Sequence, residues 1–204
     1  MRYLFILDYE HLDDGGFLKL LAKHIAGLGL ENFMLLHGDS AHTQRIVQTG
    51  VMSDKARIRS IKELNHRLTA LFADEGVPLI ALNGFQRSTV RAAGHGYEID
   101  GSYLSRLGSQ THVLLSSLAA GPDGPAPAPL STLAEALQEA VGFDYIIGFD
   151  ASEQTDEIFA PSKSTDDMCP SLRPKDLESS NLDIKILKMR HMGSKDRFTE
   201  AIST

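Results

Sequence analysis

The sequence predicts an α/β fold, a three-layer α/β/α sandwich around a mostly parallel central sheet. Short, continuously apolar runs alternate along the chain with amphipathic helical segments. Apolar runs without a polar face are typical of strands that are covered on both sides. Strands that alternate with helices favour right-handed crossovers and parallel pairing. The expected strands are Tyr3–Leu7, Phe33–Leu36, Pro78–Leu82, His112–Ser116, Tyr145–Phe149 and Ile184–Met189.

Two expected helices lie in the first half of the chain. Apolar side chains recur at helical spacing over residues 17–28, and Asp13 or Asp14 is expected to cap the start of this helix. A second apolar stripe covers residues 58–72, and Gly76 marks the end of that helix.

A third helix and two irregular segments follow. The third apolar stripe covers residues 133–141, and residues 132–135 (TLAE) match a capping box at its start. Residues 121–129 are rich in proline and glycine, so we expect an exposed loop without regular structure. Residues 153–180 are polar and show no period, which predicts a long surface loop.

Composition and charge exclude several classes of protein. The chain has 204 residues, 42% of them hydrophobic, which suits one large domain over residues 1–204. Its formal charge of −7 argues against a nucleic-acid binder. The single cysteine, Cys169, excludes an intrachain disulfide framework and is typical of a reducing compartment. No apolar run approaches the roughly 18 residues of a membrane span, and the amino terminus leads directly into a strand, so we expect a cytoplasmic protein with no membrane partner.

Several motifs follow one another in a fixed order along the chain. Residues 50–52 (GVM) precede residues 60–65 (SIKELN), and residues 76–82 (GVPLIAL) come next. The order of strand, turn, helix and strand then continues in residues 112–117 (HVLLSS), 121–124 (GPDG), 132–137 (TLAEAL) and 145–150 (YIIGFD). This ordered set resembles the amino-acid kinase superfamily, which includes N-acetylglutamate, uridylate and isopentenyl phosphate kinases.

The resemblance carries expectations about organisation and partners. It implies a substrate-side half at residues 1–117 and a shortened nucleotide-side half at residues 118–204. It also implies ATP and Mg²⁺ as cofactors, a small-molecule ligand, and a homodimer or a homologous partner subunit.

The chain departs from the family pattern at residues that a kinase needs. Asp8 stands where the family has the lysine that steadies the transferring phosphoryl group, and Ser131 stands where it has an aspartate that organises the catalytic lysines. Exchanging a lysine for an aspartate reverses an interaction on the order of 4 kcal/mol at about 4 Å. The family's His-Gly-Gly-Gly turn is reduced to residues 37–40 (HGDS), where Asp39 is expected to add to the repulsion. A standard kinase mechanism is therefore disfavoured.

Candidate ligand contacts lie in both halves of the chain. A strand that ends in glycine before a helix can hold a ligand, because the backbone comes close and the helix presents its N–H groups. On the substrate side the resemblance implies His37, Gly38, Asp39, Asn65 and Gly84, and on the nucleotide side Asp150, Phe159 and Lys163. Structural roles remain open, since a carboxylate often caps a turn, a histidine can bind a neighbouring loop, and an asparagine can join packed helices.

A metal site is a further possibility at the ends of the first two strands. Carboxylates and imidazoles gather there in the sequence, and such groups can hold a divalent ion that would restore the missing positive charge. No fixed ligand spacing supports the site. The residues concerned are Asp8, Glu10, His11, His37, Asp39 and His42.

These observations favour a divergent protein of the amino-acid-kinase fold, with weakened or absent phosphoryl transfer, that binds a small metabolite or a partner subunit. The alternative is an active ATP-dependent kinase of a small carboxylate or phosphate that uses Lys163, Mg²⁺ and a rearranged first turn. In a third reading, a homologous subunit supplies the missing lysine.

Overall fold

The computed structural model describes residues 2–7, 11–30, 32–40, 43, 54–150, 182–188, 198–200 and 202. A six-stranded parallel sheet forms the centre, in the order β10-β9-β1-β2-β6-β3. This arrangement confirms the predicted parallel sheet, and each expected strand is present with its ends within one residue of the prediction. The strands are β1 (Tyr3–Leu7), β2 (Phe33–His37), β3 (Leu79–Asn83), β6 (His112–Ser116), β9 (Tyr145–Asp150) and β10 (Ile184–Lys188).

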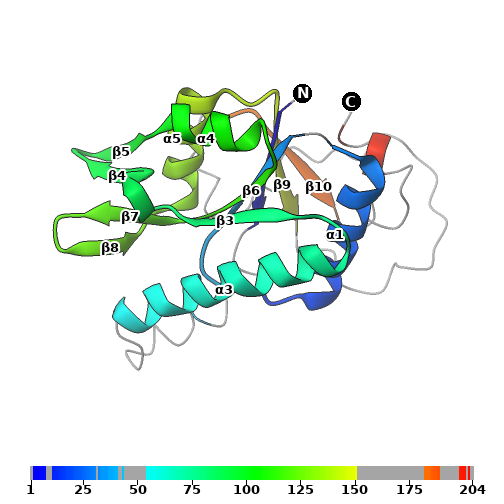
Figure 1. Cartoon of the computed structure of the whole chain (residues 1–204), viewed down its shortest axis with the longest axis horizontal. Coiled ribbons are helices and arrows are strands. Elements are labelled where there is room, and N and C mark those ends of the chain that lie inside the picture. The colour runs from blue at the N-terminus through cyan, green and yellow to red at the C-terminus, as the bar shows by residue number, and fades with distance from the viewer. Residues whose placement is uncertain are drawn as a thin grey trace.

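Helices cover both faces of the central sheet (Figure 1). One face packs against α1 (Gly15–Leu28) and α3 (Asp54–Asp74), with Phe5, Leu35 and Phe72 among the buried side chains. The opposite face packs against α4 (Gly101–Gly108) and α5 (Leu130–Val141). The three layers are those that the alternation of strands and helices predicted.

The position of a strand in the sheet determines how far it is buried. Every residue of β1 and β2 is buried, as expected for strands with neighbours on both sides and helices on both faces. β3 lies at the edge of the sheet, and its residue Ile80 is 38% exposed. An apolar run alone does not distinguish a central strand from an edge strand.

The helix starts confirm one prediction and correct another. Asp14 caps α1, since its Oδ1 accepts a 2.9 Å hydrogen bond from the N–H of Phe17. The predicted capping box at residues 132–135 is wrong, because α5 already begins at Leu130. Its N-cap is Pro129, which makes no side-chain hydrogen bond to the helix. The rigid φ of proline suits the start of a helix, and this places Thr132 inside the first turn.

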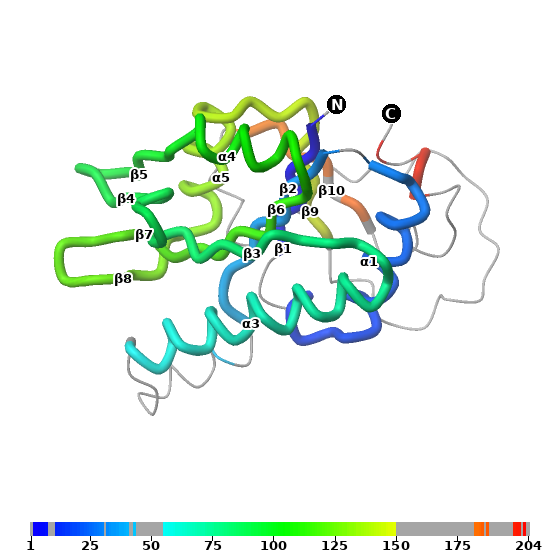
Figure 2. The backbone as a smooth tube through the Cα atoms, viewed as in Figure 1, coloured from blue at the N-terminus to red at the C-terminus, as the bar shows by residue number. Residues whose placement is uncertain are grey.

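A second, four-stranded sheet in the order β5-β4-β7-β8 lies beside the central sheet, as Figure 2 shows. It consists of two hairpins, β4 (Val90–Ala93) with β5 (Gly96–Ile99), and β7 (Leu118–Gly121) with β8 (Gly124–Pro127). The first hairpin was not predicted.

The second hairpin corrects the prediction of an irregular loop at residues 121–129. Its strand β8 is at the edge of the small sheet, where proline is tolerated because one side of the strand needs no donors. Gly124 has a φ of 118°, which explains why glycine follows the turn.

No helix in the described ranges is both long enough and apolar enough to cross a membrane. The loop predicted for residues 153–180 lies outside the described residues.

Candidate functional site

Four strands of the central sheet end in one row. The parallel register pairs Leu7 with His37, His37 with Ser116, and Ser116 with Asn83. These are the last residues of β1, β2, β6 and β3, so the row marks the carboxyl edge at which ligands of parallel α/β sheets bind. Three of the four side chains are polar, although the strands behind them are apolar.

A chain of side-chain hydrogen bonds connects this row to α3. Nε2 of His37 lies 3.2 Å from Oδ1 of Asn65, which is 3% exposed. The Asn65 amide lies 3.4 Å from Oδ1 of Asn83, and the hydroxyl of Ser116 donates to the same oxygen at 3.2 Å. Two residues named from the sequence, His37 and Asn65, thus form one array with two that were not, Asn83 and Ser116.

Burial keeps the His37 ring in its neutral form. The side chain is fully buried, and this desolvation lowers its pKa from 6.5 to about 4, against the opposing hydrogen bonds to Gly38 and Asn65. Nδ1 lies 2.9 Å from the carbonyl oxygen of Gly38, which can only accept, so the proton of the neutral ring lies on Nδ1. Nε2 then needs a donor, which Asn65 supplies when the –NH₂ end of its amide faces the ring. The charge of the ring and the orientation of the amide are therefore coupled.

Asp39 forms a buried ion pair with α3. Nε of Arg57 donates to Oδ2 of Asp39 at 2.8 Å, and the Asp39 side chain is only 1% exposed. Burial raises the pKa of Asp39, while the hydrogen bond and charge of Arg57 and the N–H of Ser40 oppose this rise. The expectation that Asp39 adds net repulsion is corrected here, because Arg57 compensates its charge. The turn after β2 is close to neutral in its described part.

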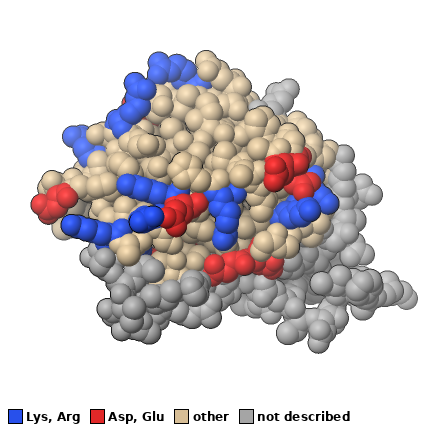
Figure 3. Space-filling model, turned by 60° about the horizontal axis from the view of Figure 1, so that its bottom comes forward, with Lys and Arg blue, Asp and Glu red and all other residues tan. Residues whose placement is uncertain are grey.

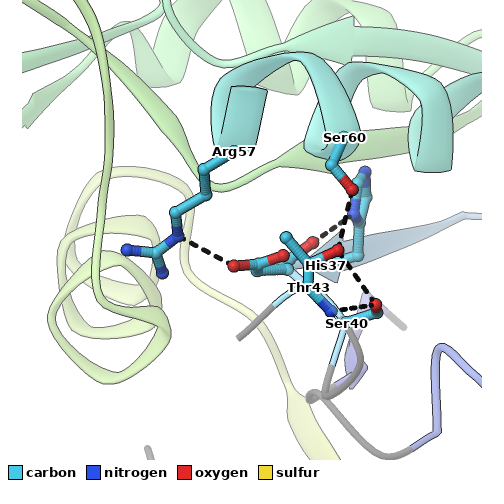
Figure 4. A network of polar contacts seen from close by, with 7 residues as sticks. His37, Ser40, Thr43, Arg57 and Ser60 are labelled. Atoms are coloured by element: carbon cyan, nitrogen blue, oxygen red, sulfur yellow. Dashed lines mark hydrogen bonds and ion pairs between the residues drawn. The ribbon is translucent and has the colours of Figure 1, made fainter. Parts of the chain in front are cut away.

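Hydroxyl groups make a second connection between this turn and α3. The N–H of Thr43 donates to Oγ of Ser40 at 3.2 Å, and Oγ1 of Thr43 lies 2.9 Å from Oγ of Ser60. Figure 4 shows Arg57 and Ser60 reaching from α3 toward the residues that follow β2. The described part of the turn is thus held against the helix at two places.

Basic side chains of α3 also lie on the face of the molecule seen in Figure 3. Arg59 binds Glu63 at 2.9 Å, and Nζ of Lys62 lies 4.6 Å from the centre of the Phe85 ring. Arg59 and Lys62 thus contact Glu63 and Phe85 rather than the buried turn at His37.

The two glycines named from the sequence lie where space is short. A Cβ on Gly84 would lie 2.3 Å from the carbonyl oxygen of Leu118, which no side chain tolerates. A Cβ on Gly38 would lie 3.2 Å from Leu130, so the start of α5 packs directly against the turn. Ser131, the second residue of α5, is 8% exposed and follows this contact. Packing alone accounts for glycine at position 84.

Other predicted site residues are not placed by the structure. Asp8, Glu10, His42, Phe159 and Lys163 lie outside the described residues. Asp150 ends β9, and only its backbone is described.

The metal hypothesis gains no support from the residues that are placed. Within the described ranges, no group of three or more His, Cys, Asp or Glu side chains could hold a metal ion. His11 packs against Phe17, with ring centres 4.6 Å apart, and both ring nitrogens of His37 already contact the protein, at the carbonyl of Gly38 and the amide of Asn65.

Sequence reasoning missed Arg57, Asn83 and Ser116. The signal for Asn83 and Ser116 was a polar residue at the end of an apolar run, which is where parallel strands expose their last side chains. Arg57 gave no such signal, because an arginine near the start of a helix is usually solvated.

The comparisons with known proteins support the fold. No protein-family model and no curated protein sequence matches the chain. An isopentenyl phosphate kinase structure matches with a TM-score of 0.57 and 12% identity, over 74% of this chain and 72% of that chain. N-acetylglutamate synthase from Neisseria gonorrhoeae matches with a TM-score of 0.58 and 18% identity, over 74% of this chain and 42% of that chain.

Aspartokinase III from E. coli is a third structural neighbour, with a TM-score of 0.53 and 9% identity, over 73% of this chain and 49% of that chain. The chain matches less than half of the synthase and of the aspartokinase. These neighbours are kinases and an acyltransferase with one common architecture, and the chain has the amino-acid-kinase fold that its motifs implied.

Proposed function

We propose that this protein binds a small polar molecule at the carboxyl edge of its sheet and does not transfer phosphoryl groups by the standard mechanism. The observation that carries the proposal is the ion pair between Asp39 and Arg57. It uses a partly buried cation of α3 that reaches the turn after β2, and the buried Asp39 carboxylate compensates that cation within the protein. A transferring phosphoryl group needs positive charge or a metal that is not already compensated.

The charges around this turn support the proposal. Asp8 follows Leu7, the register partner of His37, and it carries a negative charge where the resemblance implies a lysine. His37 adds no positive charge at neutral pH, because burial lowers its pKa to about 4. Of the described cations of α3, Arg57 contacts Asp39 and Lys62 contacts the Phe85 ring.

The hydrogen-bonding groups of the row indicate the kind of ligand. Asn83 is half-buried, and its amide is the part of the array nearest to solvent. An amide and a hydroxyl recognise neutral polar groups through donors and acceptors without adding charge. A small neutral or weakly charged polar metabolite therefore fits these residues better than a multiply charged phosphate does.

Paired assays of binding and turnover test the proposal. Small amides, alcohols, carboxylates and phosphate monoesters are screened by thermal shift, and ADP release from MgATP is measured with each compound. We expect stabilisation by a polar compound, its loss in Asn83→Ala, and no ADP release above that of the buffer. ADP release that depends on one of the compounds would establish the active kinase instead.

Partner subunits are the remaining proposal. The resemblance implies a homodimer, or a homologous subunit that supplies the missing lysine, and sedimentation of the chain alone and of material purified from its source tests both. A second, homologous chain in that material, together with ADP release by the complex only, would favour the shared site.

A further inference from the structure

A hollow lies between the 3₁₀ turn η1 (Gln86–Ser88), which follows β3, and the start of α4. Its volume is about 440 Å³, which falls in the range of small-molecule sites, about 300–1,000 Å³. It is lined by Arg87, Asp100, Ser102, Tyr103 and Arg106, none of which belongs to the array at His37.

The two arginines of this hollow differ from the other arginines in the described ranges. Each of the others donates to an acceptor: Arg2 to the carbonyl of Val141, Arg57 to Asp39, Arg59 to Glu63, Arg67 to the carbonyl of Leu12, and Arg91 to Glu98. Arg87 and Arg106 donate to no acceptor in the described part of the chain, and neither forms an ion pair there. Their planar sets of N–H donors are available to a ligand.

Both guanidinium groups lie against one aromatic ring. The central carbon of the Arg87 guanidinium is 5.4 Å from the centre of the Tyr103 ring, and that of Arg106 is 5.6 Å from it. Each contact is a favourable cation–π interaction. Because both arginines also line the hollow, an anion bound there would be attracted by both positive charges. The backbone of Arg87, inside η1, has a φ of 55°, a left-handed conformation that residues other than glycine seldom adopt.

Asp100 offsets only part of this charge. Its Oδ1 accepts hydrogen bonds from the N–H of Tyr103 at 2.9 Å and from the hydroxyl of Ser102 at 2.8 Å. These bonds, with a smaller contribution from Arg106, lower the pKa of Asp100, which is therefore ionised at neutral pH. With two arginines and one aspartate, the hollow keeps an excess of positive charge in a chain whose formal charge is −7.

We propose that this hollow binds the oxyanion group, phosphate or carboxylate, of a small molecule through the guanidinium groups of Arg87 and Arg106. Arginine suits both groups, because its parallel N–H donors match two oxygens of a carboxylate or phosphate. The site takes an anion, whereas the row at His37 lacks uncompensated positive charge in its described part. The two sites use different residues, so one can fail while the other stands.

Calorimetric titration of the full chain with inorganic phosphate and with malonate tests the site. Low ionic strength is used, because salt screens exposed charges. Arg87→Ala and Arg106→Ala are each expected to weaken binding of the preferred anion about tenfold or more, and the double variant to abolish it. Comparing the affinity for phosphate with that for malonate shows whether the site prefers a phosphate or a carboxylate group. In the native chain, the anion is expected to shift the amide resonances of residues 87 and 102–106 in NMR spectra.

Arg59→Ala and Arg91→Ala are the matched controls, since each removes one exposed arginine from elsewhere on the surface. Both are expected to bind the anion as the native chain does. An equal loss of affinity in the controls would mean general charge attraction and would overturn the site. So would unchanged affinity in the double variant, absence of binding of either anion to the native chain, or resonance shifts located elsewhere.

Discussion

Nε of Arg57 lies 2.8 Å from Oδ2 of Asp39, and this contact joins the turn after β2 to a helix whose arginine is 18 positions away in sequence. The carboxylate is 1% exposed and the arginine side chain is 27% exposed. The contact both fixes the turn and removes the charge that an anionic substrate would use. It therefore connects the stability of the site with the proposed function.

Asp39→Ala is expected to destabilise the protein by about 1–3 kcal/mol. Breaking a fully buried pair costs about 3–5 kcal/mol, and the partial exposure of Arg57 lets water recover some of that loss. The free energy of unfolding in urea measures the effect. Glu63→Ala is the matched control, because it removes the carboxylate of an exposed pair and is expected to cost about 0.5 kcal/mol or less. Equal costs for the two variants would contradict a buried pair at Asp39.

His37 makes the stability depend on pH. Its pKa is about 4 in the folded protein and about 6.5 when unfolded, so between these values the unfolded chain binds more protons. The stability from this group is complete above pH 6.5 and is lost as the pH falls toward about 4. Between pH 7.5 and 5 the loss is about 2 kcal/mol.

Urea unfolding of the native chain and of His37→Gln at both pH values isolates this contribution, because the amide does not titrate. We expect the native chain to lose about 2 kcal/mol more than the variant does. The same pH dependence in both proteins would show that His37 titrates normally.

Asn65→Ala is expected to cost about 1–3 kcal/mol, because it leaves Nε2 of the buried His37 ring without a partner. Asn83→Ala is the comparison, since Asn83 is half-buried and water can replace its amide. Its cost should be smaller by about 1 kcal/mol in the same unfolding experiment. The reverse order would mean that the array is held together from the Asn83 end.

Gly84→Ala is expected to destabilise the protein by more than about 2 kcal/mol, because the added methyl group would meet the backbone oxygen of Leu118 at 2.3 Å. Gly96→Ala adds the same methyl group in β5, where nothing lies within 4 Å, and should leave the stability unchanged or raise it slightly. Differential scanning calorimetry of both variants compares them. A small effect at Gly84 would mean that packing does not explain this glycine, and Gly84 would again be a candidate ligand contact.

The sequence predicted the parts of the fold that depend on periodicity. β1 and β6 match the prediction to the residue, because apolar strands between helices have a characteristic pattern and length. β8 was missed, because Pro125 and Pro127 are usual signs of a loop and only the edge position in the small sheet explains them.

Strand ends and the family resemblance predicted single residues of the candidate site, but not the contacts between them. His37 lies at the end of β2 as the apolar run indicated. Its partner Asn65 is 28 positions away, and only the packing of α3 against the sheet brings the two together. The compensation of Asp39 by Arg57 likewise depends on tertiary structure, which changed the expected charge of the turn from negative to nearly neutral.

Thermal unfolding with and without MgATP, on the native chain and on Asp8→Lys, tests the central claim most directly. A nucleotide at 100 times its Kd would stabilise the native state by about 2.7 kcal/mol, which is readily seen. Asp123→Lys, with the same charge change in the β7–β8 turn, is the matched control. We predict that MgATP leaves the melting temperature of the native chain and of Asp123→Lys unchanged, and a rise for Asp8→Lys alone would show that the charge of Asp8 prevents nucleotide binding. A saturable rise for the native chain, accompanied by ADP formation, would contradict the account and establish a working phosphotransferase.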